Sequence, residues 1–159
     1  MGVDSDFYNL VLVLHILAVI IGFGGMFIAG FYGAEGAKRS GSEGLAISET
    51  TMKVTSLAPT MAVYTVPILG ILLILLSDDQ WQFSDAWVSL SFLLYIVLIV
   101  LAVAVQVPNL RKLIALRTGT EGVQATEVER RTKTAAMVGG IVNLLWVIIL
   151  FLMVFKPGV

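Results

Sequence analysis

His15 is the only histidine in the chain, and it lies inside an apolar segment shortly before a run of glycines. Gly22 and Gly25 follow it at intervals of seven and three residues, so the three residues share one face of a helix. Small residues on this face would leave room for a flat ligand beside the imidazole, which can ligate haem iron or donate a hydrogen bond. The competing interpretation is that the glycines let a second helix pack closely and that His15 bonds to that helix.

Among the other polar side chains inside the apolar segments, Tyr95, Asn143 and Trp146 are the further candidates. Asn143 and Trp146 lie three residues apart on one helical face, and lipid cannot satisfy their hydrogen-bond donors. We therefore expect this face to point into the protein, where Asn143 bonds an adjacent helix and Trp146 packs against the glycine-rich face. Tyr95 lies at the predicted depth of His15 and is the expected hydrogen-bond partner of the imidazole.

These residues form the candidate cofactor-binding set, and the ligand it suggests is haem b or a quinone-like molecule. Its members are His15, Gly22, Gly25, Tyr95, Asn143 and Trp146. The chain has no cysteine, which excludes disulfides, thiolate metal sites, iron–sulfur clusters and cysteine nucleophiles. A single histidine excludes a bis-histidine haem within one chain, and no carboxylate lies inside an apolar segment. We predict no catalytic residue and no metal-ion site, and a net charge of −1 does not favour a nucleic-acid partner.

The elements that position these residues are predicted to be membrane-spanning helices. The chain is 58% hydrophobic and 13% charged, which is too apolar for a domain surrounded by water. Its 159 residues suggest one all-α integral membrane domain, residues 1–159, whose main partner is the lipid bilayer. Each of four apolar stretches is long enough to cross a hydrocarbon core of about 30 Å. The predicted spans are residues 7–31, 56–76, 86–107 and 135–155.

The charges predict how this four-helix bundle is oriented. Nine of the ten Lys and Arg residues lie in the first and third connections, and the tenth is Lys156. By the positive-inside rule both basic connections are cytoplasmic, and the N- and C-termini lie outside a bacterial plasma membrane. After Pro108, leucines and basic residues alternate as in an amphipathic helical extension at the cytoplasmic membrane surface.

Local signals predict where helices begin, bend and end. Asp4 or Ser5 can cap the first span, and Thr126 with Glu129 fits a capping box for the last. The glycines of residues 36–44 predict a loop, followed by a short helix over residues 45–54. Pro67 and Gly70 predict a kink in the second span.

The segments around these residues resemble a known family. Leu14-His15-Ile16 followed by Gly22-Phe23-Gly24-Gly25 resembles the first span of the small membrane proteins grouped as domain of unknown function 2269. Residues 31–35, 45–49 and 76–79 are similar to its actinobacterial-type members. The resemblance implies a four-helix fold and no established activity. A weaker likeness to CopD-like membrane domains implies copper or haem chemistry, but this chain lacks the further histidines of those domains.

Three functions are compatible with the sequence. The leading hypothesis is a non-enzymatic accessory, assembly or packing subunit, present as a homo-oligomer or in a larger membrane complex. The second is a haem- or quinone-binding redox protein that uses His15. The third is a small-solute transporter, which the absence of charged residues inside the spans disfavours.

Overall fold

The computed structural model describes residues 2–39, 41–118 and 125–158; within its helices, the side chains of residues 29, 37, 41 and 54–62 are not described. The described chain is all-helical and contains no strand, which confirms the predicted class. The helices, in order, are α1 (Asp6–Lys38), α2 (Gly41–Leu76), α3 (Ala86–Val100), the π-helix η1 (Leu101–Gln106), α4 (Val107–Arg117) and α5 (Ala125–Phe155).

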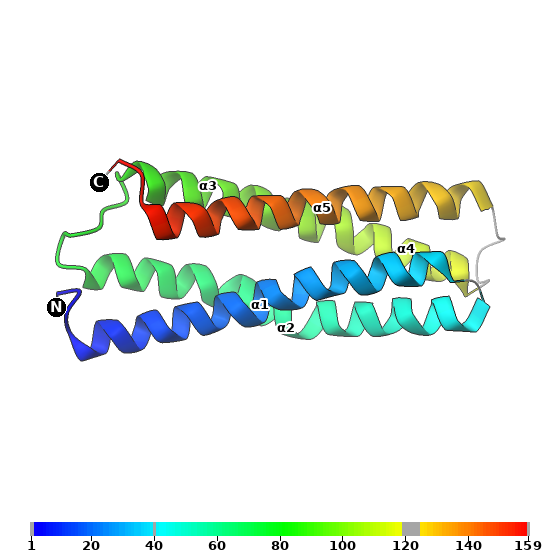
Figure 1. Ribbon diagram of the computed structural model, residues 1–159, viewed down its shortest axis with the longest axis horizontal. Coiled ribbons are helices and arrows are strands. Elements are labelled where there is room, and N and C mark those ends of the chain that lie inside the picture. The colour runs from blue at the N-terminus through cyan, green and yellow to red at the C-terminus, as the bar shows by residue number, and fades with distance from the viewer. Residues whose placement is uncertain (1, 40, 119–124, 159) are drawn as a thin grey trace.

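The helices lie side by side in one elongated bundle (Figure 1). α1 and α2 run in opposite directions and pack against each other. α3, η1 and α4 follow one another without a break, and α5 runs antiparallel to them and contacts all three. Further contacts of α1 with α5 and of α2 with α4 join the two halves. The described ends of the chain and the α2–α3 connection lie at the same end of the bundle (Figure 1).

Among the described residues, three helical stretches are long and apolar enough to cross a membrane: Asp6–Gly36, Ala86–Arg117 and Ala125–Phe155. At 1.5 Å per residue each is roughly 46–48 Å long, so its ends extend beyond a hydrocarbon core of about 30 Å. Val63–Leu76 in α2 is a shorter apolar helix. Large apolar side chains such as Leu75, Phe31 and Phe155 are about two-thirds exposed on the outside of the bundle. Such a surface suits contact with lipid, because water would not solvate it favourably.

The first connection is more helical than the sequence predicted. α1 continues to Lys38 and α2 begins at Gly41, so Gly36 and Gly44 lie inside helices and the expected loop over residues 36–44 is wrong. Both glycines serve close packing instead. A Cβ atom added at Gly36 would lie 3.0 Å from Cγ2 of Ile47, and one at Gly44 would lie 2.3 Å from the backbone oxygen of Arg39. The predicted short helix over residues 45–54 is part of α2.

The third span continues as helix through Pro108 into the predicted extension. Proline lacks an N–H group, and its ring clashes with the carbonyl group four residues earlier. The wider turns of η1 directly before Pro108 accommodate both effects, and the Val107 N–H donates to the oxygen of Ala102, five residues back. The predicted amphipathic extension is present as α4. It packs against α5 and α2 with Leu113 and Leu116 buried, and its position at the membrane surface stays a prediction.

One of the two predicted helix caps is present. The Ser5 hydroxyl accepts a hydrogen bond of 3.3 Å from the Tyr8 N–H, as an N-cap of α1 should. Thr126 is not a cap, because α5 already includes Ala125. Glu129 forms an ion pair with Lys133 instead of completing a capping box. α2 continues through Pro67 as one helix, and the predicted kink stays a prediction.

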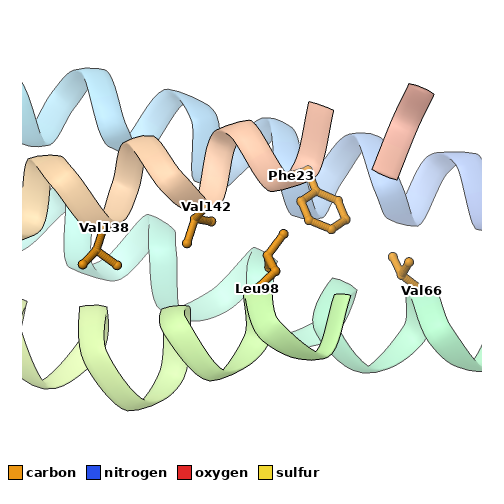
Figure 2. Close-up of a cluster of buried hydrophobic side chains, with 5 residues drawn as sticks. All are labelled: Phe23, Val66, Leu98, Val138 and Val142. Carbon is orange, nitrogen blue, oxygen red and sulfur yellow. The ribbon is translucent and has the colours of Figure 1, made fainter. Parts of the chain in front are cut away.

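The centre of the bundle is a cluster of buried apolar side chains from four helices. Figure 2 shows Leu98 of α3 between Val142 of α5 and Phe23 of α1, with Val138 and Val66 further along the bundle. Leu98 has no exposed surface. This cluster therefore joins both halves of the bundle and determines which faces of the helices point inward.

Candidate functional site

His15 lies on the inner side of α1, against the backbone of α2. A Cβ atom added at Gly70 would lie 3.4 Å from Cε1 of His15 and 3.9 Å from its Nδ1, so the imidazole occupies the space beside this glycine. Nδ1 is buried and makes no hydrogen bond of good geometry among the described residues, although the backbone of Val66 in α2 lies beside the ring. A buried polar atom without a partner is costly, and it is the one feature here that favours a ligand at His15.

Tyr95 does not bond to His15, so that prediction is wrong. Its hydroxyl group donates to the backbone oxygen of Val63 in α2. In an α-helix the Val63 oxygen would accept a hydrogen bond from the N–H of residue 67. That residue is Pro67, which has no N–H, so the oxygen is free to accept from Tyr95. Tyr95 thus satisfies a carbonyl group that proline leaves free, and it connects α3 to α2.

We predict that Tyr95→Phe destabilises the protein by about 1 kcal/mol, because it leaves a half-buried carbonyl group unpaired. Pro67→Ala restores an N–H at this position, so Tyr95→Phe should cost clearly less in a Pro67→Ala background. Unfolding titrations with dodecyl sulfate in mixed micelles measure both differences. Tyr64→Phe, at a tyrosine that is 66% exposed, is the matched control and should change little. An equal cost of Tyr95→Phe in both backgrounds would contradict this role of Pro67.

Asn143 and Trp146 lie on the contact between α5 and α1. The Trp146 ring packs against Phe23 with centroids 5.0 Å apart and planes at 43°. Nδ2 of Asn143 would lie 3.6 Å from a Cβ atom added at Gly30. Trp146 therefore packs on α1. Its predicted packing against the glycine-rich face stays a prediction, because Phe23 lies outside that face.

The six candidate residues do not gather around one centre in their described contacts. His15 lies against Gly70 of α2, after Pro67, whereas Tyr95 bonds to Val63, before Pro67. Trp146 contacts Phe23, between Gly22 and Gly25, of which Gly22 is buried and Gly25 half-buried. A surface pocket at the α2–α3 connection contains none of the six; it is lined by Ile74, Leu75, Asp78, Asp79, Trp81, Gln82 and Phe83. A shared cofactor site therefore stays a prediction.

Two amide side chains that the sequence analysis did not single out connect the third span to α5. Nε2 of Gln106 donates to the oxygen of Ala135 at 3.1 Å, while its Oε1 is buried without a partner among the described residues. Nδ2 of Asn109 donates to the oxygen of Arg131 at 2.9 Å, and its Oδ1 accepts from Nη1 of Arg131 at 3.2 Å. Gln106 and Asn109 are three residues apart and so share one helical face. This spacing could have predicted a polar contact with another helix.

Arg117, at the end of α4, makes the longest-range polar contacts at this end of the bundle. Its Nη1 donates to the oxygen of Gly36 in α1 at 3.1 Å and to the hydroxyl oxygen of Ser48 in α2 at 2.9 Å. One guanidinium group thus fixes α4 to both helices of the other half. Charge alone did not distinguish Arg117 from its basic neighbours in the sequence.

At the opposite end, Lys156 covers a pair of tryptophans. Its Nζ lies 3.9 Å from the ring centroid of Trp81 and 5.8 Å from that of Trp87, and the two rings meet nearly at right angles. The ammonium group is attracted to the electron-rich ring faces. This contact holds the end of α5 against the α2–α3 connection.

Comparison with known proteins gives one match. The family model described as "Predicted integral membrane protein (DUF2269)" matches residues 9–157. No curated protein and no solved structure matches the chain. The likeness to CopD-like domains stays a prediction. Because the match covers nearly the whole chain, and because long apolar helices form the bundle, this protein belongs to the DUF2269 family of predicted integral membrane proteins.

Proposed function

We propose that this protein is a non-enzymatic accessory or packing subunit that crosses the bacterial plasma membrane four times. The proposal rests on the contacts that polar side chains of the apolar segments make with neighbouring helices. Tyr95 donates to α2, Gln106 donates to α5, and Trp146 packs on α1. Contacts of this kind join helices, and they leave few groups available for catalysis.

The position of α2 supports four spans. α2 has 36 residues and runs antiparallel to α1, from the α1–α2 turn to the end of the bundle that holds Asp6 (Figure 1). A helix that accompanies a membrane-spanning neighbour in this way would cross the same hydrocarbon core. Its described apolar part, Val63–Leu76, is too short by itself, and residues 56–62 would complete the span.

The charges at the two ends support the proposed orientation. Nine basic residues belong to the end of α1 and its C-cap, the first half of α2, α4 and the first part of α5, and these segments lie at one end of the bundle (Figure 1). They are Lys38, Arg39, Lys53, Arg111, Lys112, Arg117, Arg130, Arg131 and Lys133. The other end carries the aspartates at positions 4, 6, 78, 79 and 85 and one basic residue, Lys156. The basic end would face the cytoplasm by the positive-inside rule, with both termini outside.

A second candidate function rests on His15 alone. Nδ1 is buried and makes no hydrogen bond of good geometry to a described residue, which favours a bound molecule at this position. Haem b or a quinone is the ligand class that suits an imidazole inside a membrane. The contact of the ring with the Gly70 backbone counts against it, because a flat ligand would have to replace part of that packing.

An absorption spectrum of the purified protein, with and without dithionite, separates the two candidates. The protein should be expressed with ample haem, and its lipid extract should be examined for quinones by mass spectrometry. The packing function predicts a featureless visible spectrum and no enriched quinone. A Soret band that shifts on reduction and disappears in His15→Ala would overturn the proposal in favour of the redox function.

The accessory role also predicts a stable assembly in mild detergent. Native mass spectrometry should find the chain in particles heavier than its own 17.2 kDa, as a homo-oligomer or with a stoichiometric partner. Cross-linking in intact membranes before solubilisation is the control for dissociation by detergent. A monomer in both preparations would contradict an accessory role.

A further inference from the structure

Two basic side chains lie together on the outer face of α4. Arg111 and Lys112 are exposed and adjacent, and Pro108 is exposed between them in helical projection. The opposite face of the same helix is buried through Asn109, Leu113 and Leu116. α4 therefore presents its cations away from the bundle.

These two cations differ from the others at the basic end, because no described residue neutralises them. Lys38 and Arg39 form ion pairs with Glu35, and Arg39 also pairs with Glu43. On α5, ion pairs join Arg130 and Arg131 to Glu127 and Lys133 to Glu129. Arg117 donates to Gly36 and Ser48. Arg111 and Lys112 make no ion pair with any residue in the described ranges, so this face carries two uncompensated positive charges.

The position of α4 brings these charges to the edge of the apolar region. α4 directly follows the apolar residues 86–105, so Arg111 and Lys112 stand within about two turns of the last of them. The backbone that carries them is fixed at both ends. Asn109 holds its start to Arg131, and Arg117 holds its end to α1 and α2. A ligand would meet a preorganised pair of cations.

We propose that Arg111 and Lys112 bind the phosphate-bearing headgroup of an anionic phospholipid. The guanidinium group offers a planar set of donors that suits two phosphate oxygens, and the ammonium group adds a second positive charge. A phospholipid matches both the cations and the apolar surface next to them. Its phosphate would contact Arg111 and Lys112, and its acyl chains would cover the exposed apolar residues of α3. Basic residues next to a membrane span attract anionic lipid in this way. The assignment holds in either leaflet and does not depend on the proposed function.

The test compares two double variants of the full-length protein that remove equal charge. Arg111→Gln with Lys112→Gln removes the uncompensated pair. Arg130→Gln with Lys133→Gln removes two exposed cations from ion pairs at the same end and is the matched control. Native mass spectrometry of the detergent-solubilised protein measures binding of phosphatidylglycerol and of phosphatidylcholine to each.

The wild-type protein should bind phosphatidylglycerol more tightly than phosphatidylcholine. The Arg111/Lys112 variant should lose about tenfold in phosphatidylglycerol affinity, and the control less than about threefold. Millimolar glycerol phosphate should not displace the lipid, because it lacks acyl chains. Equal losses in both variants, no preference for phosphatidylglycerol, or displacement by glycerol phosphate would overturn the proposal. Loss of a co-purifying acidic protein with lipid binding unchanged would overturn it in favour of a protein partner.

Discussion

Gly44→Ala should destabilise the protein by about 3 kcal/mol or more, because the added methyl group has no room beside the backbone of the α1–α2 turn. The added Cβ atom would lie 2.3 Å from the oxygen and 3.0 Å from the carbon of the Arg39 carbonyl group, and 3.1 Å from the oxygen of Gly36. All three are backbone atoms, so no side chain can rotate to make room. The α1–α2 turn would have to open, which would also move Gly36 away from Arg117. Unfolding by dodecyl sulfate in mixed micelles measures the loss.

Gly24→Ala is the matched control for this prediction. A Cβ atom added at Gly24 has no neighbour within 4 Å, and the residue lies inside α1. Alanine is favoured over glycine in a helix by about 0.8–1.0 kcal/mol, so Gly24→Ala should leave stability unchanged or raise it slightly. If Gly44→Ala were tolerated as well as Gly24→Ala, the close approach of the α1–α2 turn would be contradicted.

Leu98→Ala should cost about 2–3 kcal/mol through the cavity that it leaves. Leu98 has no exposed surface, and Figure 2 shows it at the centre of a cluster to which α1, α2, α3 and α5 all contribute. Little of the cost comes from transfer out of water, because leucine contacts lipid tails when membrane helices separate. The cost comes from packing contacts that the shorter side chain cannot replace.

Leu93→Ala provides the control on the same helix. Leu93 is 58% exposed on the outside of α3, where lipid would fill the space left by the truncation. The loss of stability should stay below about 0.5 kcal/mol. Similar losses at Leu98 and Leu93 would show that the cluster does not hold the two halves of the bundle together.

The apolar segments and their inward faces were predictable because lipid imposes simple rules on them. A helix must be long enough to cross the hydrocarbon core, and polar or small residues must face other helices. The predicted stretches 7–31 and 135–155 accordingly lie inside α1 and α5. The stretch 86–107 lies inside the continuous run of α3, η1 and α4. The contact of Trp146 with Phe23 followed from the same rule, because a tryptophan deep in a span needs neighbouring protein.

The wrong predictions concern residue types that can have either of two structural roles, and only the helix packing shows which role applies. Glycine can reverse a chain or let backbones meet, and Gly36 and Gly44 do the second. The donor of Tyr95 was assigned to His15 because both lie at one depth. The free carbonyl group of Val63 was the nearer acceptor, and it became apparent only from the order in which the helices pack.

The most direct test of four spans with a cytoplasmic basic end is the labelling of single cysteines in intact cells. The chain contains no cysteine, so Asp4→Cys, Ser42→Cys and Ser84→Cys can each be made without other changes. An impermeant maleimide should label positions 4 and 84 in intact cells and position 42 only after the cells are opened. Labelling of 42 and 84 from the same side would show that α2 does not cross the membrane. Labelling of 42 alone in intact cells would show that the orientation is reversed.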